Sequence, residues 1–229
     1  MSFRKLSHMS ETDHRLVTDA VAAAETITDG EIVTIVTSLS DHYHDIALAW
    51  ASVTTFFALS VVAVFPEFFV NTMNILSGGW EHQFTVSEHL AALFAFMATV
   101  WIGVWSILQW VPLRMIMTPK HIKQHRVRSR AICLFKVGAE SRTRGRTGIL
   151  IFLSMHEHRA EIVADKSIAD KVPPEIWGDA MLSLISHVQT GEAGKGMAAA
   201  VAQVGAVLAE HFPPGKDNPN ELPNRLIEI

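Results

Sequence analysis

The sequence is poor in cysteine and carries little net charge. Cys133 is the single cysteine among 229 residues, which excludes a disulfide framework and a clustered thiolate metal site and is typical of a protein folded in a reducing compartment. The formal net charge of −4 is too small to indicate a nucleic-acid partner for the whole chain. Residues 1–30 also lack the continuous apolar stretch of a secretory signal peptide. We therefore expect the amino terminus to stay in the compartment where it is made.

Charged side chains are missing from two long stretches of the chain. There are none in the 21 residues from Ile46 to Pro66, and none in the 24 residues from Leu90 to Leu113. With a rise of about 1.5 Å per residue, helices of this length cross the roughly 30 Å hydrocarbon core of a bilayer. The alternative, two buried helices of a soluble core, would normally show an amphipathic stripe. The sequence therefore predicts transmembrane helices at 46–66 and 90–113.

Lysine and arginine are absent from the segment between these stretches, residues 67–89, and abundant after the second one. The segment that follows carries Arg114, Lys120, Lys123, Arg126, Arg128, Arg130, Lys136, Arg142, Arg144 and Arg146. The positive-inside rule places such a basic side in the cytoplasm. We expect a protein of the bacterial cytoplasmic (inner) membrane, with both termini cytoplasmic and residues 67–89 as an external loop. Attraction to anionic lipid heads would also explain the basic run.

Two further pieces of the sequence have the pattern of a water-soluble α/β domain. In residues 12–45, a helix with apolar residues at helical spacing ends at Asp29-Gly30 and is followed by the β-branched strand EIVTIVTSL; the apolar residues are Leu16, Val17, Ala20, Ala23, Ala24 and Ile27. In residues 120–212, a basic helix precedes GILIFLSM and RAEIVAD, which the polar turn HEHR joins as a hairpin. Because GILIFLSM is apolar throughout, both of its faces must be covered. The two pieces therefore predict an α/β fold with a small mixed sheet and flanking helices.

Two closing helices complete the pattern. Pro173-Pro174 begins the first, and glycines at 191, 194 and 196 are expected to break it. The apolar stripe of the second is Met197, Val201, Val204, Leu208 and Phe212. Residues 213–229 contain so much proline and asparagine that we expect an irregular tail, whose Leu226, Ile227 and Ile229 could dock on the domain.

Parts of the sequence resemble TPM-domain proteins. TDGEIVTIVTSL resembles the early TG-x-EI-V-V strand of that family, and RTGILIFLSMHEHRAEIVADKSIADKVP resembles its central core. Residues 177–212 are similar to its two closing helices, and FPPG with NELPN looks like the tail of its bacterial membrane-anchored branch. The resemblance implies that residues 12–45 start one TPM-like domain, a transmembrane hairpin interrupts it, and residues 120–212 finish it.

This resemblance implies two functions of different classes. Some members of the family are associated with phosphatase activity, and plant relatives with repair or assembly of photosynthetic membrane complexes. Here the family's amino-terminal D-x-x-x-x-L-s segment is absent, its G-x-G after the hairpin is ADKS, and no nucleophile stands beside a base. We therefore expect a scaffold or an assembly and maintenance factor that binds the bilayer and another membrane or cytoplasmic protein. A membrane-anchored phosphatase is the alternative.

The phosphatase alternative would need oxygen ligands for a divalent cation such as calcium or magnesium. The acidic residues that match the family pattern are Asp29, Glu31 and Asp165. A structural role is the favoured reading of Asp29, as a turn or cap residue, and of Glu31, at a solvated strand edge. For Asp165, at the end of a strand, the structural and the functional reading are balanced. Asp165 would close a strand where parallel sheets commonly present ligands.

Histidines form two close pairs in the sequence. DHYHD contains His42 and His44, and HEH contains His156 and His158. In an extended chain, two histidines separated by one residue lie on the same side, which is a workable start for a zinc site. If EIVTIVTSL and GILIFLSM are parallel neighbours, both pairs emerge at the same end of the sheet. The alternative is that they are loop histidines without a ligand.

Overall fold

The computed structural model describes residues 9–76, 85–138, 147–215 and 221–229. It shows a mixed α/β protein that divides into two compact units. One unit consists of Met1–Asp41 and Lys120–Ile229 and contains the sheet, and the other consists of His42–Pro119 and is helical. The α/β unit is therefore assembled from segments that are far apart in the sequence.

A four-stranded mixed sheet forms the centre of the α/β unit. Its strand order is β3-β2-β1-β4, with β1 at Glu31–Thr37, β2 at Gly148–Ser154, β3 at Arg159–Ala164 and β4 at Ile227–Glu228. β1 runs parallel to β2 with Glu31 opposite Gly148, β3 runs antiparallel to β2, and β4 runs parallel to β1. The expected small mixed sheet and its hairpin are confirmed.

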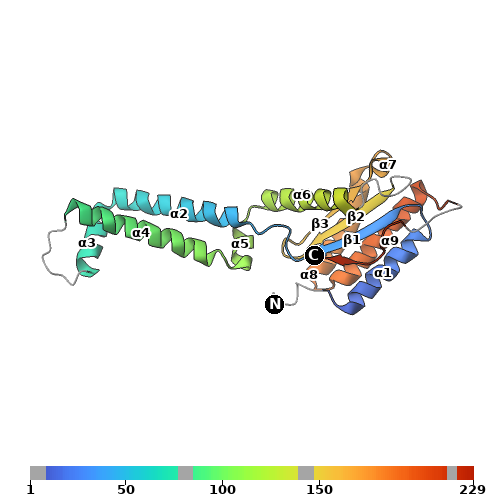
Figure 1. Ribbon diagram of the computed structural model, residues 1–229, viewed down its shortest axis with the longest axis horizontal. Coiled ribbons are helices and arrows are strands. Elements are labelled where there is room, and N and C mark those ends of the chain that lie inside the picture. Colours follow the sequence, from blue (N-terminus) through green and yellow to red (C-terminus); the bar gives the residue numbers. More distant parts are fainter. Residues whose placement is uncertain (1–8, 77–84, 139–146, 216–220) are drawn as a thin grey trace. The chain divides into compact units, whose positions relative to one another are not determined.

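Both faces of this sheet are covered by helices, as the apolar sequence of β2 predicts. Ile149, Ile151 and Leu153 belong to the larger hydrophobic core, and Leu150 and Phe152 to a smaller one on the opposite face. The larger core lies under α1 (Glu11–Glu25), α8 (Gly178–Gln189) and α9 (Ala193–His211), and the smaller under α6 (Lys120–Gly138), as Figure 1 shows. Along the chain, β3 is connected to α8 by α7 (Lys166–Ala169) and the 3-10 turn η2 (Pro174–Trp177).

Helix α1 begins with a capping box. The Ser10 hydroxyl accepts from the Asp13 N–H, and the Asp13 carboxylate accepts in return from the Ser10 N–H. Its buried residues are Val17, Val21 and Ala24. Leu16 and Ile27, which the sequence pattern assigned to the same face, are exposed. Val21 takes the place of Leu16 in the buried stripe of α1, and Ile27 lies beyond the end of the helix.

Glycines set the close packing of α9. Gly191 has a φ of +83° in the turn after α8, as expected of a helix breaker. Gly194 and Gly196 instead lie inside α9, so the expectation that they break a helix is wrong. A Cβ at Gly196 would come within 2.7 Å of the Cβ of His187, and one at Gly205 within 2.7 Å of the Cβ of Ala24. These glycines let α9 approach α8 and α1.

The carboxyl-terminal tail crosses the β1 edge of the sheet. Leu222 packs into the smaller core and Leu226 into the larger one, and β4 follows directly. Ile35 pairs with Ile227, and the Ile229 N–H donates to the Val36 carbonyl at 3.0 Å. The expectation of an irregular tail over residues 213–229 is therefore wrong for this strand, because β1 supplies a partner that local sequence does not reveal.

The second unit contains α2 (His44–Val64), α3 (Pro66–Leu76), α4 (Val86–Ile107) and α5 (Val111–Met117). By length and composition, α2 and α4 could each cross a membrane. The second apolar helix differs from the expected 90–113, because a capping box of Thr85 and Glu88 starts it earlier and a turn before Pro112 ends it at Ile107. Helix α3 occupies the first half of the expected 67–89 loop, and Gly78 and Trp80 lie outside the described residues.

Candidate functional site

Asp29 fixes the chain that follows α9. Its Oδ1 accepts from the Gly215 N–H at 2.7 Å, and its own N–H donates to the Phe212 carbonyl at 3.0 Å. The Thr147 hydroxyl donates to the Asp29 carbonyl at 3.0 Å, which joins the entry into β1 to the entry into β2. Asp29 thus holds two turns together, in agreement with its reading as a turn residue.

Glu31 holds the tail from inside the sheet. It is only 4% exposed, so the expectation of a solvated strand edge is wrong, and its Oε2 accepts from the Leu222 N–H at 3.0 Å. Burial raises the pKa of the Glu31 carboxyl, while the N–H groups of Leu222 and Glu221 oppose the rise. This carboxyl therefore ties the start of β1 to the chain that leads to β4.

A second carboxyl, that of the half-buried Glu25, lies near Glu31. Its Oε1 accepts from the Ile32 N–H at 3.0 Å, on the side of β1 that faces β4. Burial raises the pKa of Glu25 to about 7, the Ile32 N–H lowers it in part, and the charge of Glu31 raises it further. A hydrogen bond with the tail residue Asn224 also acts on this carboxyl. Glu25 and Glu31 together hold the tail against β1.

Asp165 lies at the N-cap of α7, directly after β3. It is 5% exposed, and its Oδ2 accepts from the Gly148 N–H at 3.3 Å. Because β3 runs antiparallel to β2, the end of β3 meets the amino-terminal ends of the parallel strands. Asp165 is therefore not at the carboxyl end of the parallel pair, where parallel sheets commonly present ligands.

The acidic residues bind backbone groups, and each secures a different connection. Asp29 secures the turn after α9, Glu31 the tail, and Asp165 the start of β2. Within residues 9–76, 85–138, 147–215 and 221–229, no group of three or more His, Cys, Asp or Glu residues is arranged to hold a metal ion. Each of these three carboxylates thus joins two segments of the chain through a backbone hydrogen bond.

The two histidine pairs fall in different compact units. His156 and His158 lie in the turn between β2 and β3, where His158 has a φ of 48°. Burial lowers the pKa of His156, and the charge of Glu157 opposes this effect. His42 and His44 lie at the start of α2, with ring centroids 5.6 Å apart and ring planes at 24°.

Glu157, between the two turn histidines, is a residue that sequence reasoning missed. It is buried, and its carboxylate accepts from the Ser40 N–H at 2.9 Å and from the Ser154 hydroxyl at 2.5 Å. It thereby joins the chain after β1 to the end of β2. The spacing of Ser154 and Glu157, three residues apart across a turn, is the signal that would have pointed to it.

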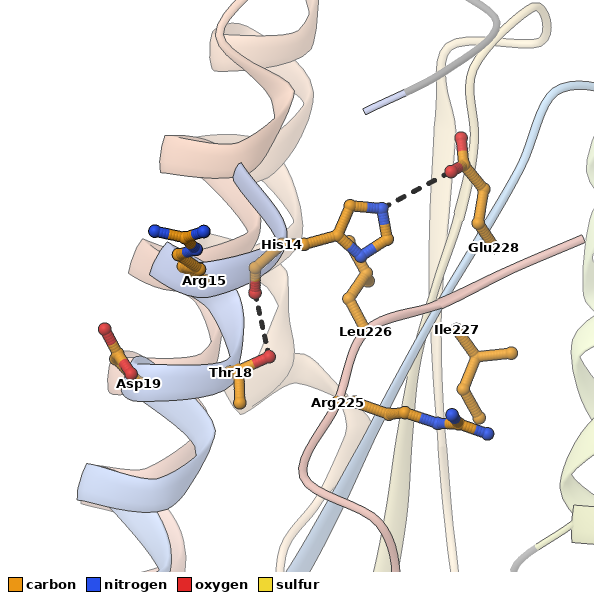
Figure 2. Close-up of a pocket in the computed structure, with 8 residues that line it drawn as sticks. All are labelled: His14, Arg15, Thr18, Asp19, Arg225, Leu226, Ile227 and Glu228. Carbon is orange, nitrogen blue, oxygen red and sulfur yellow. Dashed lines mark hydrogen bonds and ion pairs between the residues drawn. The ribbon is translucent and has the colours of Figure 1, made fainter. Parts of the chain in front are cut away.

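The α/β unit has a groove between α1 and the tail. Its volume is about 500 Å³, and it is lined by His14, Arg15, Thr18, Asp19, Arg225, Leu226, Ile227 and Glu228. Figure 2 shows His14 reaching from α1 to Glu228, with Nε2 and Oε2 3.4 Å apart. The other Glu228 oxygen, Oε1, accepts from the Met9 N–H at 3.1 Å.

The groove combines both signs of charge with apolar surface. Arg15 and Arg225 supply cations, Asp19 and Glu228 supply carboxylates, and Ile227 supplies apolar area. Such a lining suits a segment of polypeptide, which brings backbone amides and mixed side chains, better than a small ion of one sign. No sequence signal marked this groove, because its two walls come from opposite ends of the chain.

Comparison with known proteins identifies a similar fold. No protein-family model matches the chain, and no curated protein matches it. A solved structure that resembles it is the NMR structure of the BA42 protein from the psychrophilic bacterium Bizionia argentinensis. That protein is 16% identical, the likeness covers 97% of each chain, and the TM-score is 0.55. At this level of identity the likeness shows the fold alone.

Proposed function

We propose that α2 and α4 anchor this protein in the bacterial cytoplasmic membrane, with both termini in the cytoplasm. In this proposal the α/β unit, TPM-like in its fold, is a scaffold or an assembly and maintenance factor for membrane complexes. It binds a segment of a partner protein, and the bilayer holds it near that partner.

The main observation in support of a membrane anchor is that large apolar side chains are exposed along both α2 and α4. Phe56 and Phe57 of α2 are 70% and 68% exposed, and Phe94 of α4 is 77% exposed. Core helices of a soluble protein bury such side chains, whereas the most apolar window of α4 has no buried residue. At about 25 cal/mol per Å² of apolar surface, contact with water over two helices is strongly unfavourable. Both helices are long enough to span the hydrocarbon core of a bilayer, so lipid would cover these side chains.

The apolar cavity beside α3 also supports a location in the bilayer. A cavity of about 550 Å³ between α2, α3 and α4 is lined almost wholly by apolar side chains, among them Phe57, Phe65 and Phe96. The hydroxyls of Thr54 and Thr72 on its wall donate to carbonyls of their own helices, both at 2.8 Å. These two hydroxyls therefore need no hydrogen bond from water, as the interior of a bilayer requires.

The scaffold assignment rests on the groove between α1 and the tail. One wall is β4, an edge strand of two residues, and extended segments of partner proteins commonly bind beside exposed sheet edges. The carboxylates that the phosphatase alternative would use as metal ligands instead accept backbone hydrogen bonds. Both features favour binding of a protein over hydrolysis of a phosphate ester.

Membrane extraction and topology reporters test the anchor. We expect the full chain to stay in the membrane pellet at alkaline pH, and a reporter fused before Met1 or after Ile229 to read cytoplasmic. A reporter inserted at Gly78, outside the described residues, should read external. Release into the supernatant, or a cytoplasmic reading at Gly78, would contradict the proposal.

Photo-crosslinking in cells tests the groove. A crosslinker at Arg225 should yield a discrete adduct with a membrane protein, identified by mass spectrometry, because this side chain lines the groove. The matched control is Leu182, which is exposed on α8 and outside the groove. The same adducts from both positions, or none from Arg225, would count against the scaffold.

A further inference from the structure

The start of α2 is a helix end without a side-chain cap. Tyr43 occupies the N-cap position with a φ of 52°, and its side chain makes no cap hydrogen bond. The first turn of this long helix therefore offers backbone N–H groups and the positive end of its dipole. A helix end alone does not make a binding site, and here a second residue comes from another helix.

That residue is Arg114 of α5. It is 3% exposed, and one of its terminal nitrogens, Nη1, lies 3.5 Å from Nδ1 of His44, the first residue of α2. Because arginine can only donate, His44 Nδ1 accepts and its Nε2 carries the hydrogen. Among the described residues the Arg114 Nε has no hydrogen-bond partner, and no ion pair joins Arg114 to a carboxylate. A buried guanidinium with so few partners calls for a compensating anion.

The junction that holds Arg114 is well packed. The Trp50 indole N–H donates to the Met117 carbonyl at 3.1 Å, which ties α2 to the end of α5. The Thr118 hydroxyl donates to the Arg114 carbonyl at 2.7 Å. Tyr43, Ala47 and Ala51 of the same unit are fully buried. The Arg114 guanidinium therefore lies against His44 in the first turn of α2, and the side chains of His42 and His44, whose rings stack, are exposed.

We propose that this junction binds the phosphate of an anionic membrane phospholipid. The Arg114 guanidinium and the His44 Nε2–H would donate to the phosphate oxygens, together with N–H groups of the first turn of α2. A guanidinium fits phosphate in a two-pronged geometry that an ammonium cannot reproduce. Since α2 is a candidate membrane span, its first turn would lie at the depth of lipid head groups. The inference in this respect rests on the proposed function.

Asp45 sets the balance of charge at this site. It lies in the same first turn, and its carboxylate lowers the positive potential that a phosphate would meet. Most of the affinity must therefore come from Arg114 and His44 rather than from the helix dipole. Removing the Asp45 charge should strengthen binding, whereas removing the Arg114 charge should weaken it.

Lipid titration of the purified full chain in neutral detergent tests the site. Native mass spectrometry would measure binding of phosphatidylglycerol, with phosphatidylcholine and inorganic phosphate in separate arms. We expect phosphatidylglycerol to bind best and Arg114→Gln to weaken its binding about tenfold. Asp45→Asn should tighten it. The matched control Arg130→Gln, which changes an exposed arginine of α6, should leave the affinity unchanged.

The outcomes distinguish a specific lipid head-group site from non-specific electrostatic attraction of anionic lipid to the protein. Equal losses in Arg114→Gln and Arg130→Gln would mean diffuse attraction to basic residues, and equal binding of phosphatidylcholine would mean no head-group site. Inorganic phosphate bound as tightly as the lipid would identify free phosphate as the ligand. Each of these results overturns the proposal.

A second variant protects the test against misfolding of Arg114→Gln. His44→Ala keeps the guanidinium and removes one donor, so it should weaken phosphatidylglycerol binding about threefold. An unchanged affinity in this variant would also overturn the proposal. Membrane extraction distinguishes failure of the proposed function from failure of the head-group site. Release of the wild-type chain from the membrane would contradict the proposed function. A chain that stays in the membrane but shows no lipid preference would contradict the head-group site alone.

Discussion

The two compact units place apolar and polar side chains in opposite ways. In the α/β unit, β2 is buried on both faces and carboxylates such as Glu31 and Asp165 accept backbone hydrogen bonds inside. In the helical unit, Phe56 and Phe94 face outward while Arg114 is buried. Runs of apolar residues in one sequence thus lead to two different results. The difference shows that burial within the chain, and not hydropathy alone, distinguishes a core strand from a helix that needs an external apolar partner.

The largest expected effects come from two variants, each of which places one aspartate in one unit, and they concern the stability of the α/β unit and the membrane insertion of the helical unit. Ile35 is 6% exposed and packs in the smaller core, so Ile35→Asp should lower the free energy of unfolding of the α/β unit by several kcal/mol. Protease resistance of residues 147–212 in detergent should fall. Phe94→Asp, on the outward face of α4, should leave that resistance unchanged and impair membrane insertion by about 3 kcal/mol. Unchanged resistance in Ile35→Asp would show that the first segment is not part of the folded unit.

A smaller loss of stability is expected from a substitution at Gly205, where α9 closely approaches α1. Gly205→Val adds a branched side chain where even a Cβ would lie 2.7 Å from the Ala24 Cβ, so it should destabilise the α/β unit by about 2 kcal/mol. Chemical denaturation followed by circular dichroism would measure the change. Gly178→Ala is the control, because no atom lies within 4 Å of the added carbon. Equal effects of both substitutions would argue against the close approach of α9 and α1.

The pH dependence of stability should report the half-buried Glu25. Because its pKa of about 7 in the folded state exceeds the usual glutamate value of 4.5, the folded state holds this proton more tightly. Stability should therefore be highest below about pH 4.5 with respect to this group and decline as the pH rises through 7. Glu25→Gln keeps a carbonyl that can accept from Ile32 and should remove this decline, by no more than about 2 kcal/mol at pH 8 after allowance for solvent screening. Parallel stability curves for the wild type and the variant would contradict this assignment.

The smallest effect is expected for Asp165→Asn. The amide oxygen can still accept from the Gly148 N–H, so the cost should be about 1 kcal/mol or less, with membrane insertion unchanged. The purified wild-type chain should show at most feeble phosphatase activity with magnesium or calcium. Robust turnover of a phosphomonoester that is lost in a folded Asp165→Asn variant would favour the anchored phosphatase instead.

The sequence predicts those elements whose pattern is local. The apolar run of β2 predicts a strand covered on both faces, and the stripe from Met197 to Leu208 predicts the buried face of α9, both of which are confirmed. The parallel pairing of β1 with β2 and the pairing of β4 could not be read in this way. Each depends on a partner that lies far away in the sequence, and two residues of β4 carry no periodicity of their own.

The candidate sites were harder to predict than the fold. Glu31 reads as a solvated strand residue until the tail N–H groups are placed over it, and Glu157 is hidden between two histidines that attract more attention. The groove has walls from α1 and from residues 225–228, which no local pattern connects. Chemistry carried by a short motif is visible in a sequence, whereas chemistry assembled by tertiary contacts is visible only in the folded structure.

The tail that crosses the edge of the sheet also has a consequence for how the protein is made. Leu222 binds Glu31 across 191 residues, and Met9 binds Glu228 across 219. A ribosome therefore releases β1 long before it synthesises β2 or β4, and the whole helical unit emerges in between. During that interval β1 is an unpaired apolar strand, the kind of segment that aggregates unless it is shielded. Biogenesis of this protein should therefore depend on a chaperone that holds the nascent amino-terminal segment until residues 221–229 have left the ribosome.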